Sequence, residues 1–275
     1  MRSGYILVFL AAAMWGTLGI FARLLYSFNL DTYTIVFYRV LFALILLAIY
    51  LKLLGLPLLA SKRRLPFYAA YGFFSVFLFY SLYFYTVKVS SVSFAVLMLY
   101  TAPAYSIVLG RLLFGEPLTS RKIAAFLSVL SGVFMLNAGG LEFSPIAIAA
   151  GLASGLTYAL YGVFAKFAVR HEEPERVLFN TLLLGLPFLL PFTDPRVPMG
   201  ALPYLLALAF FPTFLGYILY NRALKEVEVG RASIIATVEP VIAMALAFLI
   251  FGESLGPSQI AGGALIILGS LLARH

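Results

Sequence analysis

Ten apolar runs of roughly membrane-spanning length restrict what this chain can fold into. A helix needs about 20 mostly apolar residues to cross the hydrocarbon core of a bilayer. Only 11% of the residues are charged, whereas soluble domains average about 25%. The sequence therefore predicts an all-α integral membrane protein with ten transmembrane helices, over residues 4–26, 33–54, 65–87, 91–113, 120–138, 145–169, 177–192, 202–223, 232–251 and 257–273.

Lysine and arginine are distributed unevenly over the ends of these predicted helices, and such residues favour the cytoplasmic side of a membrane. One side holds Arg23, Lys88 and Arg196, while Arg39 falls inside a helix. Both termini are therefore predicted to be cytoplasmic, and the formal charge of +8 suggests membrane orientation rather than a nucleic-acid partner. The predicted cytoplasmic side holds the other fifteen basic residues, Arg2, Lys52, Lys62, Arg63, Arg64, Arg111, Arg121, Lys122, Lys166, Arg170, Arg176, Arg222, Lys225, Arg231 and Arg274.

The phrase FGEPL at 114–118 returns as FGESL at 251–255, at an offset of 137 residues. At that offset Pro103 corresponds to Pro240, and Glu116 to Glu253. Near the N-terminus the offset is 143, where Gly19 corresponds to Gly162 and Arg23 to Lys166. Such internal similarity predicts two related halves, residues 1–138 and 144–275. Each half has five predicted helices, an odd number, so the second half enters the membrane from the opposite face as an inverted repeat, an architecture that transporters use for alternating access.

The run YILYNRALKEVEVGRASIIATVEPVIAMALAFLIFGESLGPSQIAGGALIILGS resembles EamA-type members of the drug/metabolite transporter superfamily. Its weaker copy from Tyr80 to Met135 and the early Trp15-Gly16 pair resemble them too. The resemblance implies a multi-pass carrier of small metabolites in the plasma membrane of a prokaryote, often an exporter, with amino-acid exporters among the relatives. It also implies a central cavity lined by the first, third, fourth, sixth, eighth and ninth helices.

Aromatic residues make up 16% of the chain, and several tyrosines recur at i, i+3 spacing on one helix face. A tyrosine near the middle of a membrane carries a hydroxyl that needs a partner, so these residues can line a polar cavity or pack helices together. Pro103 and Pro240 lie at matched places inside predicted helices, where proline removes a backbone hydrogen bond, and they are candidate hinges. The candidate substrate-binding residues are Trp15, Arg39, Tyr80, Tyr83, Tyr100, Tyr158, Tyr161, Tyr217, Tyr220, Asn221 and Glu239.

Two charged residues lie deep within predicted helices, where a charge costs about 3 kcal/mol on insertion scales. Burial disfavours the charged form of Glu239, which is a candidate for binding an amine or coupling transport to protons, with a structural role as the alternative. Arg39 can bind a substrate carboxylate, pair with Glu239, or extend its charged tip toward the interface.

The two FGE glutamates allow a gate, a coupling site or a connector. The connector is preferred, because each follows a glycine suited to ending a helix and precedes the next helix, near Thr119 or Gly256 as its N-cap. A carboxylate there can accept from the unpaired N–H groups of that next helix.

Other functions lack the residues that they would need. The chain has no cysteine, and it has neither a nucleotide-binding glycine motif nor a zinc-binding motif, so no cofactor, no metal and no enzymatic activity are expected. A lipid flippase or a channel of the same architecture stays open as an alternative to a carrier. The expected partners are a small-molecule substrate and the lipid bilayer, with protons as the candidate coupling ion.

Overall fold

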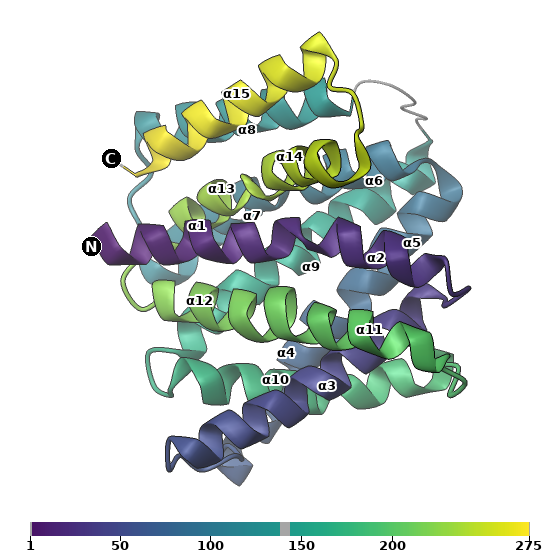
Figure 1. Ribbon diagram of the computed structural model, residues 1–275. Coiled ribbons are helices and arrows are strands. Elements are labelled where there is room, and N and C mark those ends of the chain that lie inside the picture. Colours follow the sequence, from purple (N-terminus) through teal and green to yellow (C-terminus); the bar gives the residue numbers. More distant parts are fainter. Residues whose placement is uncertain (1, 138–143, 275) are drawn as a thin grey trace.

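The computed structural model describes residues 2–137 and 144–274, and all regular elements in those ranges are helical (Figure 1). The α-helices are α1 (Arg2–Gly16), α2 (Leu18–Tyr26), α3 (Thr32–Leu53), α4 (Leu65–Gly72), α5 (Phe79–Val89), α6 (Val92–Leu99), α7 (Ala102–Phe114), α8 (Ser120–Leu136), α9 (Pro145–Ala168), α10 (Pro174–Leu189), α11 (Leu202–Leu208), α12 (Gly216–Ala223), α13 (Val229–Ala236), α14 (Glu239–Phe251) and α15 (Pro257–Ala273). Shorter 3-10 or π segments are η1 (Lys62–Arg64), η2 (Phe73–Leu78), η3 (Leu190–Phe192), η4 (Met199–Ala201) and η5 (Ala209–Leu215).

Consecutive helices join into longer runs, eight of which are long and apolar enough to cross a membrane. The eight runs end within a few residues of the predicted helices. The other two predicted helices, α8 and α15, are present but have only 17 residues each. The eight runs are 3–26, 32–53, 62–89, 92–114, 145–168, 174–192, 199–223 and 229–251.

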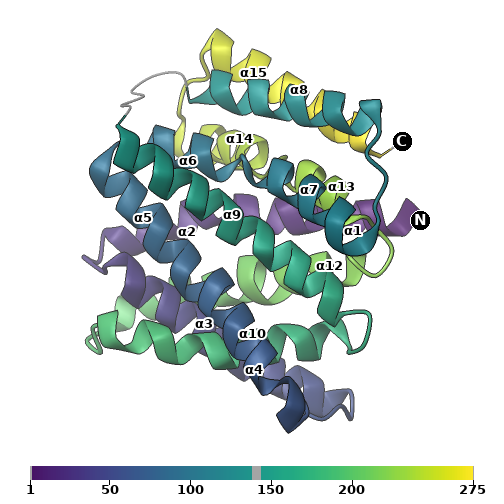
Figure 2. The ribbon, with the colours of Figure 1, turned by 180° about the vertical axis from the view of Figure 1, so that it is seen from behind.

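The two chain ends lie at the same end of the helix bundle, as both ribbon views show (Figures 1 and 2). We call this the basic end, because its connections, around 54–64, 115–119, 169–173 and 224–228, lie beside most of the lysines and arginines. The opposite end, called the far end, contains the connections 27–31, 90–91, 193–198 and 252–256.

Two of the long runs are interrupted at equivalent places, which the sequence prediction of continuous helices missed. The break between α6 and α7 falls at Tyr100 and Thr101, and the break between α13 and α14 falls at Thr237 and Val238. These breaks occupy equivalent places at the offset of 137. Pro103 and Pro240 therefore stand in the first turn of a second half-helix, where proline costs no intrahelical hydrogen bond, rather than at a kink inside a continuous helix.

Two π-helical segments, η2 and η5, also occupy equivalent places in the two halves. Such segments widen one helical turn and often occur at functional sites. Each comes directly before a tyrosine pair, Tyr80 and Tyr83 after η2 and Tyr217 and Tyr220 after η5. The wider turn therefore sets which way these tyrosines face.

Helices α8 and α15 pack closely against each other along one side of the bundle (Figures 1 and 2). The Ser128 hydroxyl donates to the carbonyl oxygen of Leu265 at 2.8 Å, and these two positions are 137 residues apart. A Cβ added at Gly132 would lie 2.5 Å from the carbonyl oxygen of Gly262, and one at Gly262 would lie 2.6 Å from that of Gly132. Small residues thus let the two backbones touch, as in other membrane helix pairs.

Replacing Gly132 with alanine should separate α8 from α15, because the new methyl group has no room. We expect a loss of about 1–3 kcal/mol in the free energy of unfolding, the usual cost of overpacking, measured by denaturant unfolding in detergent. The neighbouring exposed Ser131 provides the control, and Ser131→Ala should change little. Equal stability of the two variants would contradict close backbone packing here.

Candidate functional site

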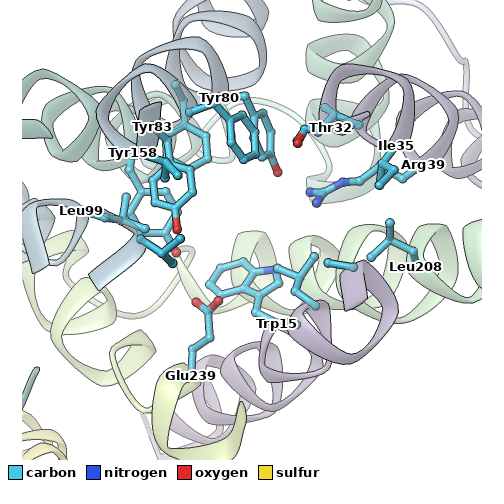
Figure 3. Close-up of a pocket in the computed structure, with 18 of the residues that line it drawn as sticks. Trp15, Thr32, Ile35, Arg39, Tyr80, Tyr83, Leu99, Tyr158, Leu208 and Glu239 are labelled. Atoms are coloured by element: carbon cyan, nitrogen blue, oxygen red, sulfur yellow. The ribbon is translucent and has the colours of Figure 1, made fainter. Parts of the chain in front are cut away.

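A cavity of about 700 Å³ lies in the middle of the bundle (Figure 3). Tyr26, Thr32 and Val92 stand at helix termini of the far end, so the cavity reaches that end. Its walls are formed by Trp15, Leu18, Gly19, Ala22, Arg23, Tyr26, Thr32, Ile35, Val36, Arg39, Phe79, Tyr80, Tyr83, Phe84, Val87, Val92, Leu99, Tyr158, Leu208, Tyr217 and Glu239.

The structure brings seven of the eleven candidate binding residues together in this wall. They are Trp15, Arg39, Tyr80, Tyr83, Tyr158, Tyr217 and Glu239. Tyr161 and Tyr220 instead line a separate enclosed space of about 20 Å³ toward the basic end. Asn221 is fully buried and accepts a hydrogen bond from the Tyr161 hydroxyl at 3.0 Å. Tyr100 lies at the break between α6 and α7, buried next to Glu239.

Arg39 is the most unusual residue of the cavity, because its charge is buried without a matching acid. Its side chain is 5% exposed and its guanidinium lies 5.3 Å from the ring centre of Tyr80. Across residues 2–137 and 144–274, no ion pair includes Arg39, and its Nε atom has no hydrogen-bond partner. The pairing with Glu239, one of three alternatives that the sequence left open for Arg39, is thus not formed here. A buried guanidinium that contacts Tyr80 and Tyr217 but pairs with no carboxylate among the described residues favours an anionic ligand group.

Glu239 is the first residue of α14 and faces the cavity from the wall opposite Arg39 (Figure 3). The N-terminus of a helix carries a partial positive charge, which stabilises a carboxylate there. The helix break at Thr237 and Val238 therefore makes an acid tolerable at this depth, which a continuous helix would not do.

Aromatic rings form much of the remaining wall. The Trp15 indole lies 5.2 Å from the ring of Tyr217, and Phe79 lies 5.3 Å from Tyr158. The Trp15 Nε1–H donates to the carbonyl oxygen of Pro212 at 3.0 Å. Pro212 belongs to η5, so this π segment also fixes the indole ring. That contact could not be predicted from the sequence, although a proline within a predicted helix is a signal for irregular backbone.

The path from the cavity toward the basic end is closed. The Glu116 carboxylate accepts hydrogen bonds from the backbone N–H groups of Val229, at 2.6 Å, and Gly230, at 3.2 Å. Burial raises the pKa of the Glu116 carboxyl, although these two N–H groups and the nearby Lys122 act in the opposite direction. Glu116 was expected to accept from the helix that follows it, and that expectation is wrong, since its partners belong to α13 in the other half of the chain.

Four ion pairs between residues far apart in the sequence surround this closed end. Their acidic members lie in the connections between helices or in the first turn of the following helix, and their basic members lie on neighbouring helices or connections. The pairs are Arg64 with Glu172, Lys122 with Glu228, Arg222 with Glu175 and Lys225 with Glu173. Among the described residues, the cavity therefore reaches the far end but not the basic end.

The chain matches the model of a known protein family. The EamA-like transporter family matches twice, over residues 2–138 and 145–274, and the chain belongs to that family. It is thus a multi-pass membrane transporter and not a member of an enzyme family.

Similar proteins come from several prokaryotes. An uncharacterized transporter of Archaeoglobus fulgidus is 32% identical over 99% of this chain and 97% of its own length. A probable amino-acid metabolite efflux pump of Salmonella typhimurium is 28% identical over 64% of each chain. A probable terminal-alkyne amino-acid exporter of Streptantibioticus cattleyicolor is 26% identical over 66% of this chain and 63% of its own. One crystal structure, at 20% identity, shares the fold with a TM-score of 0.85 over 99% of this chain and 98% of that one.

One-sided access can be tested with single cysteines, because the chain has none of its own. Tyr83→Cys lies in the open cavity and should react with a water-soluble maleimide. Ser233→Cys lines the enclosed space and should react at least roughly tenfold more slowly, since local opening must come first. The measurement is the labelling rate of purified protein by mass spectrometry. Equal rates would show that the basic end is open.

Proposed function

We propose that the chain exports small zwitterionic solutes with an apolar or aromatic side chain, amino acids or close relatives of them, by alternating access. The observation that carries this proposal is one aromatic cavity with Arg39 on one wall and Glu239 on the other, open at a single end. The names of two similar proteins, an amino-acid metabolite efflux pump and an amino-acid exporter, support the same substrate class.

Each part of such a solute has a matching group in the cavity. The substrate carboxylate binds the Arg39 guanidinium, whose planar donors suit a carboxylate. The substrate ammonium group binds Glu239. The side chain lies among Trp15, Tyr83 and Tyr158, where aromatic surface is buried at little cost in desolvation. Each of the two fixed charges gains an oppositely charged partner when such a solute bridges them.

The proposed architecture is ten transmembrane helices in two inverted five-helix repeats, residues 1–138 and 144–275. The breaks, the π segments and the Ser128 to Leu265 hydrogen bond at equivalent positions support it. The basic end faces the cytoplasm of a prokaryotic cell, following the distribution of lysine and arginine. The cavity then faces outward, in the conformation from which an exporter releases its substrate.

Arg39→Gln tests the carboxylate site. The variant should transport an aromatic amino acid about 10–100-fold less efficiently, because a hydrogen bond to a charged group contributes about 1.5–3 kcal/mol. It should also lose the preference for the amino acid over its uncharged amide. Reconstituted vesicles and a panel of apolar and aromatic amino acids provide the measurement.

The control for this variant is Arg196→Gln, which removes a basic residue exposed at the far end and should leave transport unchanged. Unaltered discrimination between acid and amide in Arg39→Gln would refute the carboxylate site. Uptake that rises linearly with concentration and never saturates would instead favour a channel.

Glu239 also explains how protons could drive export. A proton and a substrate ammonium group compete for the same carboxylate, so binding of one releases the other, as exchange requires. Glu239→Gln keeps the shape but cannot change its charge. The variant should fold and exchange substrate across the membrane, with weaker binding and no response to an imposed pH gradient. A wild-type protein that ignores the pH gradient, together with normal transport by Glu239→Gln, would leave only a structural role for this residue.

A further inference from the structure

The closed basic end is built from a small set of contacts, those of Glu116 between the two halves and the others within the second half. Glu116 accepts from the N–H groups of Val229 and Gly230, the first two residues of α13, which have no partner within their own helix. Lys166 donates to the carbonyl oxygens of Leu224 and Val227, both at 2.7 Å. These contacts hold α7, α9 and α13 together across the path.

Gly162 is a closely packed point of this closure. A Cβ added there would lie 3.1 Å from the Tyr220 hydroxyl and 3.1 Å from a methyl group of Val229. No side chain larger than hydrogen fits without displacing one of them. Glycine at this position thus lets α9 pack against Tyr220 of α12 and Val229 of α13 and close the path between the cavity and the basic end.

Every residue of this closure has an equivalent at the far end, where the path is open. At the offset of 137, Glu116, Tyr220, Leu224, Val227, Val229 and Gly230 correspond to Glu253, Tyr83, Val87, Ser90, Val92 and Ser93. At the offset of 143, Gly162 and Lys166 correspond to Gly19 and Arg23. The same residue types recur at most of these positions.

The far-end equivalents are at present apart. Among the described residues, none comes within 4 Å of a Cβ built on Gly19, and both Gly19 and Val92 line the open cavity. Val92 is 60% exposed. Arg23 and Glu253 pair with each other at 2.5 Å, with side chains that are 58% and 52% exposed. One set of residues is thus sealed and its equivalent is open in the same structure.

We propose that Glu253 and Arg23 are the latch of the far end, and that this end closes by the contacts now seen at the basic end. Glu253 then accepts from the N–H groups of Val92 and Ser93, the first two residues of α6, where the helix dipole favours a carboxylate. Arg23 turns to the carbonyl oxygens of Val87 and Ser90.

In the same closure, Gly19 packs against Tyr83 and Val92, as Gly162 now packs against Tyr220 and Val229. When the far end closes, Glu116 releases α13 and the basic end opens. The two FGE segments therefore act as latches of opposite gates rather than as connectors alone. This inference rests on alternating access within the proposed function, but it does not depend on which solute is carried.

Two cysteine pairs test the inference without any substrate. Gly162→Cys with Val229→Cys marks the contact that exists, and should form a disulfide rapidly under mild oxidation in reconstituted vesicles. Gly19→Cys with Val92→Cys marks the contact inferred, and should form one more slowly, only when the far end closes. Rapid reaction of the first pair and none of the second over many hours would overturn the proposal.

Variants of the two latch glutamates sharpen this test, because they should have opposite effects on the rate of disulfide formation by the Gly19 and Val92 cysteine pair. Glu253→Ala should slow its disulfide formation about tenfold, by removing charged hydrogen bonds from the closed far end. Glu116→Ala should accelerate it, by removing the same bonds from the closed basic end. Glu116→Gln, which keeps one accepting oxygen, should act in the same direction but less strongly, and serves if the alanine variant does not fold.

Arg196→Ala is the control for loss of charge at the far end and should leave the rate unchanged. Changes in the same direction for Glu253→Ala and Glu116→Ala, or no change in either, would assign both glutamates to connector roles and overturn the latch. Failure of amino-acid transport with the expected disulfide pattern would overturn only the proposed substrate.

Discussion

The need to satisfy every backbone hydrogen-bonding group in lipid governs this structure. Away from water, an unpaired N–H or C=O costs several kcal/mol, so a chain crossing the hydrocarbon must be helical wherever lipid touches it. Departures from regular helix are tolerated only where protein or a cavity surrounds them. The breaks at Thr101 and Thr237 and the segments η2 and η5 all lie on runs that contribute to the cavity or pack around it. Irregular backbone thus coincides with the candidate site because lipid does not contact the backbone there.

The same constraint explains the charges of the cavity. A buried Arg39 without an acid nearby and a Glu239 at a half-helix N-terminus are each costly in a low-dielectric surrounding. Arg39 contacts the Tyr80 ring, but neither residue forms an ion pair with another of the described residues. Their position on opposite walls of one cavity makes sense when a ligand supplies the missing partners.

Hydropathy and charge were sufficient to predict the helical runs, because they express how each residue interacts with lipid and water. The offset between FGEPL and FGESL likewise predicted equivalent positions. The irregular segments could be predicted only in part: prolines mark η5 and the starts of α7 and α14, whereas η2 has no proline and depends on packing between helices. The partner of Glu116 was equally hidden, because Val229 and Gly230 are more than a hundred residues away. Trp15, Tyr83, Tyr158 and Glu239 line the cavity, whereas Tyr161 and Asn221 form a hydrogen bond with each other outside it.

A protein with two equivalent ends needs a reason to rest with one of them closed. Identical latches would give both closed forms nearly equal free energy, which suits exchange between them. Residues outside the latches make the free energies of the two closed forms unequal. Lys122 pairs with Glu228 at the basic end, whereas their equivalents at the offset of 137 are Gln259 and Ser91, which carry no charge. In the proposed topology, the basic residues that orient the chain in the membrane therefore also stabilise closure on the side where they gather, so topology and resting conformation follow from the same charges.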